Sequence, residues 1–330
     1  MSTSASMGKG AEGNARASGR VMDGLVTLIG GGGFVGRYAA QALMRSGLRI
    51  RVAQRDPRQA FLLKPLGGLG QSQFVAADVT RPDSIARAVE GATAVINLAG
   101  TFGARMAQVQ ADGAGIVAEA AARAGAGTLV HLSAIGADSG SPSLYGRSKG
   151  RGEEAVRAAF PGATILRPST VFGREDQFVN RFARMIEVAP VVPVLRAGVR
   201  FQPVFVQDVA EAIRAAVKGG QGGTFELGGP DVMTMRQLLH WIADATGRHA
   251  RFVELPDAVG SLIARAGFLP GAPITKDQWL MLQRDSVVAD GAEGLAALGV
   301  TPTPLAAVAP QWLVRYRRMG RFGRRSASHV

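Results

Sequence analysis

The stretch TLIGGGGFVGR, residues 27–37, places four consecutive glycines between a short apolar run and the start of a helical pattern. Gly30, Gly33 and Gly36 fit the spacing G-x-x-G-x-x-G. Such glycines allow a tight turn, a close approach of the backbone to a pyrophosphate, and close packing of the helix on the strand. The alternative is an ordinary glycine-rich loop, which the flanking strand and helix patterns disfavour. The stretch therefore predicts a strand–turn–helix unit that binds a dinucleotide through helix-terminal amides.

Short apolar runs alternate with helical patterns from residue 25 onward, which is typical of a parallel sheet with helices on both faces. The runs lack polar alternation, as expected of strands that are covered on both sides. The chain is therefore predicted to be an α/β protein, a Rossmann-type doubly wound parallel sheet with a smaller, mostly helical C-terminal lobe. We expect strands at 25–29, 48–53, 73–77, 93–99, 128–134 and 164–168, and helices at 34–46, 82–90, 104–124 and 145–159.

The pattern loosens after about residue 175, where Pro and Gly become frequent and helices dominate. These helices are expected at 207–217, 234–246, 257–266 and 275–284. We therefore divide the chain into four parts. They are a disordered extension at 1–24, a nucleotide-binding domain at 25–175 whose sheet is completed by parts of 200–230, a substrate or partner lobe at 176–310, and a basic tail at 311–330.

The composition is that of a globular protein, with 330 residues of which 47% are hydrophobic and 19% charged. No apolar run approaches the roughly 20 residues of a membrane-spanning helix. The absence of cysteine excludes disulfides and thiolate metal sites, and the four histidines show no metal-ligand spacing, so we expect no metal. We expect a cytoplasmic protein, either free or held peripherally on the cytoplasmic face of the inner membrane.

The net charge of +13 raises the question of an anionic partner. Most arginines are scattered singly, and no nucleic-acid recognition motif is present, so nucleic acid is not expected. The last 37 residues differ, because they carry six arginines and no acid, with Trp312, Tyr316 and Phe322 between them. This tail could contact anionic headgroups or an acidic partner subunit, and the alternative is a frayed, solvated terminus.

The choice of cofactor depends on RVAQRDP, residues 51–57, at the end of the second expected strand. An acidic residue at this place would bind the adenosine ribose of NAD, but the chain offers Gln54 and Arg55. A guanidinium pairs well with the 2′-phosphate of NADP, so NADP(H) is favoured over NAD(H). In the alternative interpretation Asp56 is the ribose ligand and Arg55 is a solvated charge.

Tyr145 and Lys149 lie four residues apart in YGRSK, at the start of an expected helix, so both side chains leave one face. A neighbouring ammonium would lower the pKa of the tyrosine from about 10 towards the range of a useful acid or base. Ser133 follows the fifth expected strand, at the sheet edge where such folds bind ligands. The three residues predict a hydride-transfer site. The alternative is a solvated helix face that matches by accident.

The glycine turn with Ser133, Tyr145 and Lys149 resembles the short-chain dehydrogenase/reductase superfamily, in its extended or atypical branch. Phe34 and Val35, inside the glycine turn, are expected to pack under the cofactor or, equally, within the core. The resemblance implies further cofactor contacts. These are Asp78 and Val79 at the adenine, Leu98, Ala99 and Gly100 along the cofactor, Tyr145 with Lys149 at the nicotinamide ribose, and Pro168 in a covering turn.

A narrower resemblance rests on residues 160–186, which include FGRED, on QPVFVQDVAEAI at 202–213, and on the basic C-terminal region. These stretches are similar to the nucleotide-binding accessory subunits of respiratory complex I and their bacterial relatives. The resemblance implies a tightly held NADPH, partners among respiratory-complex subunits, and slight turnover. One departure is that the Asn usual in the helix after NLAG is replaced by Gln110 or Asp112, in a register that the sequence leaves open.

Two functions follow from these observations. In the first, the chain is an accessory or assembly protein of complex I that holds NADPH. In the second, it is an active NADP-dependent reductase, epimerase or dehydratase on a sugar nucleotide or a quinone-related carbonyl, with Tyr145 as acid and base. The C-terminal lobe is mostly apolar, which favours an apolar ligand or none.

Overall fold

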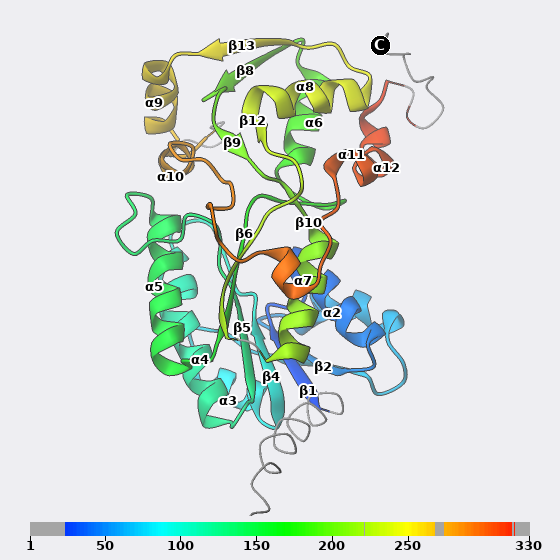
Figure 1. Cartoon of the computed structure of the whole chain (residues 1–330), viewed down its shortest axis with the longest axis vertical. Coiled ribbons are helices and arrows are strands. Elements are labelled where there is room, and N and C mark those ends of the chain that lie inside the picture. Colours follow the sequence, from blue (N-terminus) through cyan, green and yellow to red (C-terminus); the bar gives the residue numbers. More distant parts are fainter. Residues whose placement is uncertain (1–23, 221, 268–273, 319, 321–330) are drawn as a thin grey trace, which may run out of the picture. The chain divides into compact units, whose positions relative to one another are not determined.

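The computed structural model describes residues 24–220, 222–267, 274–318 and 320 (Figure 1). The expected N-terminal extension, apart from Gly24, lies outside the described residues, and so does most of the expected tail beyond residue 318.

A seven-stranded sheet has the order β11-β6-β5-β4-β1-β2-β3, and the ladders among β1 to β6 are parallel. The chain order reverses at β1, which lies between β2 and β4, so this is a doubly wound sheet. The predicted fold class is confirmed. The strands are β1 (Leu25–Ile29), β2 (Arg49–Gln54), β3 (Ser72–Ala76), β4 (Ala92–Asn97), β5 (Thr128–Leu132), β6 (Thr164–Pro168) and β11 (Gly223–Leu227).

Helices cover the sheet, with α3, α4 and α5 on one side and α2 and α7 on the other (Figure 1). Alanines and valines of α4, such as Ala114, Val117 and Ala118, are at most 1% exposed, because small side chains allow this helix to lie close on the strands. The helical elements are α2 (Phe34–Arg45), η1 (Pro57–Leu66), α3 (Pro82–Val89), η2 (Gln108–Asp112), α4 (Gly113–Arg123), α5 (Leu144–Ala159) and α7 (Val206–Gly219).

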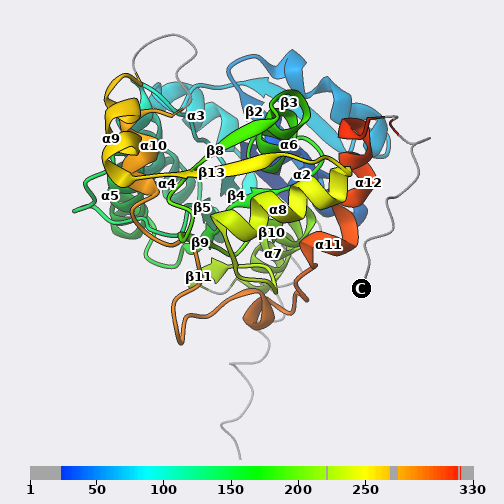
Figure 2. The same ribbon diagram turned by 90° about the horizontal axis from the view of Figure 1, so that it is seen from above.

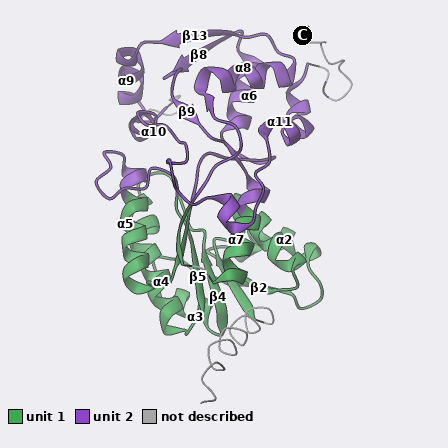
Figure 3. Cartoon of the chain, viewed as in Figure 1, with its two compact units in different colours: residues 1–133, 148–166, 210–225 green, residues 134–147, 167–209, 226–330 purple. Residues whose placement is uncertain are grey.

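The chain forms two compact units that interleave along the sequence (Figure 3). Unit 1 comprises residues 1–133, 148–166 and 210–225, and unit 2 comprises 134–147, 167–209 and 226–330. The contiguous domain boundaries expected at 175 and 310 stay a prediction.

Unit 2 combines helices with three two-stranded sheets, which pair β10 with β7, β12 with β9, and β13 with β8. Figure 2 shows β13 running beside β8. Helices α7, α8, α9 and α10 were predicted, whereas α6 and the short strands were not. Strands of two to five residues carry little periodicity. The elements are β7 (Val171–Phe172), α6 (Val179–Val188), β8 (Val191–Leu195), β9 (Arg200–Phe201), β10 (Val204–Phe205), β12 (Met233–Thr234), α8 (Met235–Thr246), β13 (Arg251–Leu255), α9 (Asp257–Arg265), α10 (Lys276–Met281), η3 (Leu295–Leu298), α11 (Leu305–Val308), α12 (Pro310–Leu313) and η4 (Val314–Tyr316).

The first part of the expected tail is packed into unit 2. Trp312 is 9% exposed and stacks on Phe205, with ring centroids 6.3 Å apart. Arg315 donates to the Oδ1 atom of Asn180 at 2.6 Å, and Tyr316 is buried. For this segment, the expectation of a solvated terminus is therefore wrong. The expectation that its aromatic rings lie on lipid headgroups is wrong as well, because Trp312 and Tyr316 are packed in the core. Within the described ranges, no helix is both long and apolar enough to cross a bilayer.

Candidate functional site

The glycine turn lies at the carboxyl edge of the sheet. The Gly30 amide donates to the Ala53 carbonyl of β2 at 2.8 Å. Gly30 has φ +80°, and a Cβ there would lie 3.2 Å from the backbone of Leu98. A Cβ on Gly36 would lie 2.6 Å from the Cα of Gly31. The turn therefore requires glycine at position 30 for the backbone conformation and at position 36 for the close packing of α2.

The amino end of α2 is suited to an anion. Gly33 is its N-cap, no side chain caps the helix, and the first turn has no acid, so backbone amides and the positive end of the helix dipole face outward. Gln54 stands beside the turn, where its Oε1 accepts from the Gly32 amide at 2.9 Å. These features fit a pyrophosphate. Phe34 and Val35 are half-buried in the first helical turn, and Phe34 packs edge-on against Tyr38.

The choice between NADP(H) and NAD(H) depends on the residues at the end of β2. The Asp56 carboxylate accepts from the Arg58 amide at 3.1 Å and from Arg58 Nε at 2.9 Å, so it caps η1. The bond to Arg58 holds the pKa of Asp56 below its ordinary value. Arg55 is exposed at the end of the strand. The carboxylate is thus committed to η1, while the guanidinium of Arg55 faces solvent.

The other cofactor residues predicted in unit 1 follow β3 and β4. Asp78 accepts from the amide of Thr80 at 3.0 Å, and the bonds from Thr80 lower the pKa of Asp78. Val79 is buried. Asn97, the first residue of NLAG, accepts from the Ala99 amide at 3.1 Å and so shapes the loop. Leu98 and Ala99 are half-buried and Gly100 is exposed. The structure therefore brings these residues to the same sheet edge as the glycine turn.

Ser133 has a buried partner that was not predicted from the sequence. Its hydroxyl donates to the Oε1 atom of Glu153 at 2.6 Å, and both residues are buried. The second carboxylate oxygen of Glu153 accepts from Arg157 at 3.0 Å. Glu153 lies one helical turn beyond Lys149 on α5, and this spacing was the available signal. A hydroxyl has one proton, so in this arrangement Ser133 directs its proton to Glu153.

Lys149 is 6% exposed, and its Nζ donates to the Leu132 carbonyl at 2.9 Å. Burial lowers the pKa of Lys149 to about 8, and the Glu153 carboxylate partly offsets this shift. Tyr145 lies one turn earlier on α5. Burial raises the pKa of Tyr145 to about 12, so the lowering that we expected from the lysine is not found. Loss of solvation of the phenolate is the dominant effect.

Pro168 ends β6 in unit 2, where its carbonyl accepts from the Ile135 amide at 3.0 Å.

The structure decides the register after β4. Gln110 lies in the π-helical turn η2, is 2% exposed and accepts from the Ser148 hydroxyl at 3.0 Å. Its amide nitrogen donates to the Thr101 carbonyl. Asp112 is exposed. Gln110 is therefore the inward residue beside the α5 segment that carries Lys149, and π turns of this kind are frequent at functional sites.

The model of the NAD dependent epimerase/dehydratase family matches residues 26–228. This chain belongs to that family.

Two curated relatives with different names show what the chain is similar to. One, from Arabidopsis thaliana, is named NADH dehydrogenase (ubiquinone) 1 alpha subcomplex subunit 9, mitochondrial. It is 34% identical, over 94% of this chain and 82% of the relative. Another, from Caulobacter vibrioides, is named ceramide reductase and is 33% identical, over 76% of this chain and 80% of the relative.

A solved structure shares the fold. It is the dTDP-glucose 4,6-dehydratase DesIV of Streptomyces venezuelae with NAD and TYD bound, with a TM-score of 0.69 and 20% identity. The match covers 90% of this chain and 98% of that one.

One further feature of this epimerase/dehydratase family member lies in the sheet. His131 on β5 pairs with Asn97 on β4, with Nδ1 and Nδ2 3.2 Å apart. Because Asn97 donates its amide hydrogen, the ring is neutral and carries its proton on Nε2, an atom without a hydrogen-bond partner. Burial, with the charge of Lys149, lowers the pKa of His131 to about 3. His131 is therefore a buried, neutral residue of the sheet.

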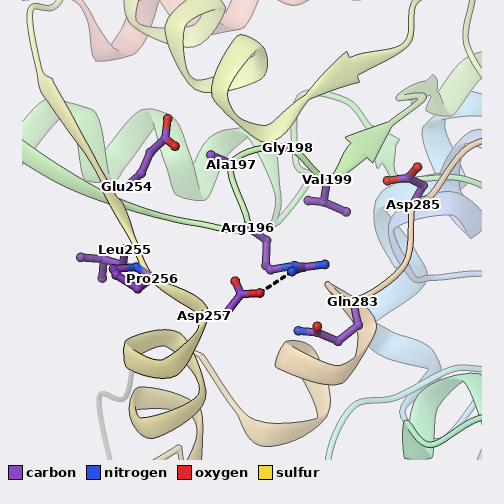
Figure 4. Close-up of a pocket in the computed structure, with 10 residues that line it drawn as sticks. All are labelled: Arg196, Ala197, Gly198, Val199, Glu254, Leu255, Pro256, Asp257, Gln283 and Asp285. Carbon is purple, nitrogen blue, oxygen red and sulfur yellow. Dashed lines mark hydrogen bonds and ion pairs between the residues drawn. The ribbon is translucent and has the colours of Figure 1, made fainter.

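Unit 2 holds a pocket of about 390 Å³ that sequence reasoning did not predict (Figure 4). Arg196 lines it in the left-handed region, with φ +50°, and its Nη1 pairs with Asp257 at 2.5 Å. The walls also carry Glu254, Gln283 and Asp285. Glu254 and Asp285 are themselves paired with Arg236 and Arg200. The pocket is therefore polar and balanced in charge.

Proposed function

We propose that this chain is an NADP(H)-holding accessory or assembly protein of respiratory complex I, in which the nucleotide stabilises the fold and turnover is slight. The relative from Arabidopsis thaliana, which aligns with 94% of this chain, is named as a subunit of NADH dehydrogenase. The observation that supports a slight turnover is the hydrogen bond from Ser133 to Glu153. A serine that gives its proton to a buried carboxylate is poorly placed to donate to a substrate carbonyl.

The preference for NADP(H) rests on the residues after β2. Gln54 is neutral and does not repel a 2′-phosphate, whereas Asp56 is held by Arg58 and caps η1. Arg55 is exposed and supplies a guanidinium, which pairs well with phosphate.

A bound dinucleotide would supply or accept a hydride. The chain would hold its pyrophosphate at the turn Gly30–Gly36 and the amino end of α2, where a capping side chain is absent. We keep Lys149 as the ligand of the nicotinamide ribose, Tyr145 as its neighbour, and Pro168 as the covering residue. Asp78 and Val79 would contact the adenine, and the loop at 98–100 would line the cofactor.

Release of the nucleotide tests this proposal. The purified chain is denatured, and the released nucleotide is identified and counted. We expect one NADPH per chain that exchanges slowly, because a ligand bound only to the folded state stabilises it by mass action. An empty or freely exchanging site would contradict the proposal. Co-purification with complex I from detergent-treated membranes tests the partner and the attachment to the cytoplasmic face of the inner membrane.

A second candidate function is an active NADP-dependent reductase, epimerase or dehydratase. It is favoured by the relative named ceramide reductase and by the retention of Tyr145 and Lys149 one turn apart on α5. Oxidation of NADPH on addition of long-chain ketones, quinone-related carbonyls or nucleotide sugars would reveal it. In that case Tyr145→Phe should abolish turnover while the nucleotide content stays the same.

A further inference from the structure

Large apolar side chains are exposed along one short segment of unit 1. η1 buries Ala60 and Leu63, both 0% exposed, and turns other apolar residues outward. We name the exposed residues the η1 face: Phe61 at 40%, Leu62 at 50%, Leu66 at 45% and Leu69 at 109% exposure. Single exposed leucines are common on soluble proteins, but four large apolar side chains within nine residues indicate a surface that is covered in use.

The elements around the η1 face are strongly basic. η1 packs against α2, β2 and β3. Residues 34–76, which contain all four elements, carry seven Arg or Lys and one acid. That acid is Asp56, which is paired with Arg58. This stretch of 43 residues thus supplies +6 of the net +13 charge. Residues 34–76 therefore carry a clear excess of positive charge, of which Glu90 partly compensates Arg51 and Asp78 partly compensates Arg55.

One of these cations lies within the η1 face. The Nζ atom of Lys64 is 3.7 Å from the centroid of the Phe61 ring. Phe61 in turn packs edge-on against Phe74 of β3, with centroids 5.4 Å apart. β3 is the edge strand of the sheet, so η1 lies at a margin of unit 1 beside α2 (Figure 1). Apolar rings and leucines with a cation among them are typical of segments that enter the headgroup region of a bilayer.

We infer that the η1 face binds an anionic lipid surface, with Leu62, Leu66 and Leu69 entering the headgroup region and the surrounding cations attracting the lipid phosphates. Charge complementarity decides the occupant, because the excess of seven cations over one acid in residues 34–76 fits a continuous anionic surface. This inference goes beyond the proposed function and does not use the C-terminal arginines.

Sedimentation with vesicles tests the inference. The full chain is mixed with vesicles of phosphatidylcholine alone or with phosphatidylglycerol added. We expect binding to the anionic vesicles only, weakened by salt, because each cation near the surface contributes a factor of about five. The triple substitution Leu62→Ser, Leu66→Ser, Leu69→Ser should weaken binding at least about tenfold, through the loss of buried apolar area. Lys64→Glu should weaken binding as well.

Three controls complete the test. The substitutions Val259→Ser and Leu262→Ser remove exposed apolar side chains of unit 2, 40% and 67% exposed, and should leave binding unchanged. Circular dichroism must show the same thermal transition for each variant as for the parent chain. The variant Arg321→Ser, Arg324→Ser, Arg325→Ser should retain most of the binding. The inference is overturned if anionic vesicles do not bind, if only the arginine variant loses binding, or if binding requires membrane proteins in the vesicles.

Discussion

The hydroxyl of Ser133 donates to the carboxylate of Glu153 at 2.6 Å, within the buried part of unit 1. The two residues are 20 positions apart and lie after β5 and on α5. A buried carboxylate needs such donors, because removing a charge from water is costly unless hydrogen bonds replace the lost hydration. Ser133 therefore stabilises the buried carboxylate of Glu153, in addition to any role at a cofactor.

Ser133→Ala is expected to destabilise the chain by about 1–3 kcal/mol, because it leaves a buried oxygen of Glu153 short of a donor. The free energy of unfolding in urea measures the effect, and the nucleotide content should not change. Glu153→Gln is the matched variant, since it keeps an acceptor for the serine while removing the pair with Arg157. Full stability together with lost turnover in Ser133→Ala would instead point to a serine that donates to substrate.

Gly36→Ala is expected to abolish nucleotide binding and to destabilise the chain by about 1–3 kcal/mol, because the new Cβ would lie 2.6 Å from the backbone of Gly31. Calorimetry with NADPH and urea unfolding check the two effects. Gly162→Ala serves as control, since its Cβ would meet no atom closer than 4.0 Å. Normal NADPH binding by Gly36→Ala would place the nucleotide elsewhere.

Arg55→Ala is expected to weaken NADPH binding about tenfold or more and to leave NADH binding within about twofold, because only NADPH has a 2′-phosphate for the guanidinium. Titrations of both nucleotides give the two dissociation constants. Arg49→Ala removes an exposed arginine from the opposite end of β2 and should affect neither. Equal losses for both nucleotides would argue against a contact with the 2′-phosphate.

His131 is expected to make stability depend on pH. Its pKa is about 3 in the folded chain and about 6.5 in the unfolded chain, so between these values the unfolded chain binds the extra proton. The free energy of unfolding should therefore decrease as the pH is lowered, by about 2 kcal/mol between pH 6.5 and pH 5. His131→Gln keeps an acceptor for Asn97 and should show a smaller decrease over this range in urea unfolding. Equal slopes in both proteins would exclude the histidine as the source.

Local pattern was sufficient for the sheet and for the glycine turn. β1 and β6 begin and end at the predicted residues, because strands covered on both sides appear as continuous apolar runs. The glycine spacing identified the turn, since the requirement for a missing side chain acts within seven residues of chain. The order of strands and helices along the chain was predicted as well, because apolar runs and helical patterns alternate in the sequence.

Other features required contacts between distant parts of the chain. Pattern alone left Gln110 and Asp112 as alternatives, and a π turn selected Gln110. Aromatic residues near the C-terminus looked suited to a membrane surface, whereas Trp312 is packed on Phe205. The η1 segment carries no regular α-helical or strand pattern, so its exposed apolar face could be seen only in the structure.

The sequence by itself determined where the chain can turn without side chains, which segments are apolar enough to be strands, and which residue types stand at the strand ends. These properties depend on neighbours along the chain. Only the tertiary structure decided which polar groups are partners, as Glu153 is for Ser133, and how far burial shifts their pKa values. Those properties depend on the packing of α5 against β5, which brings atoms together from positions that no local spacing connects.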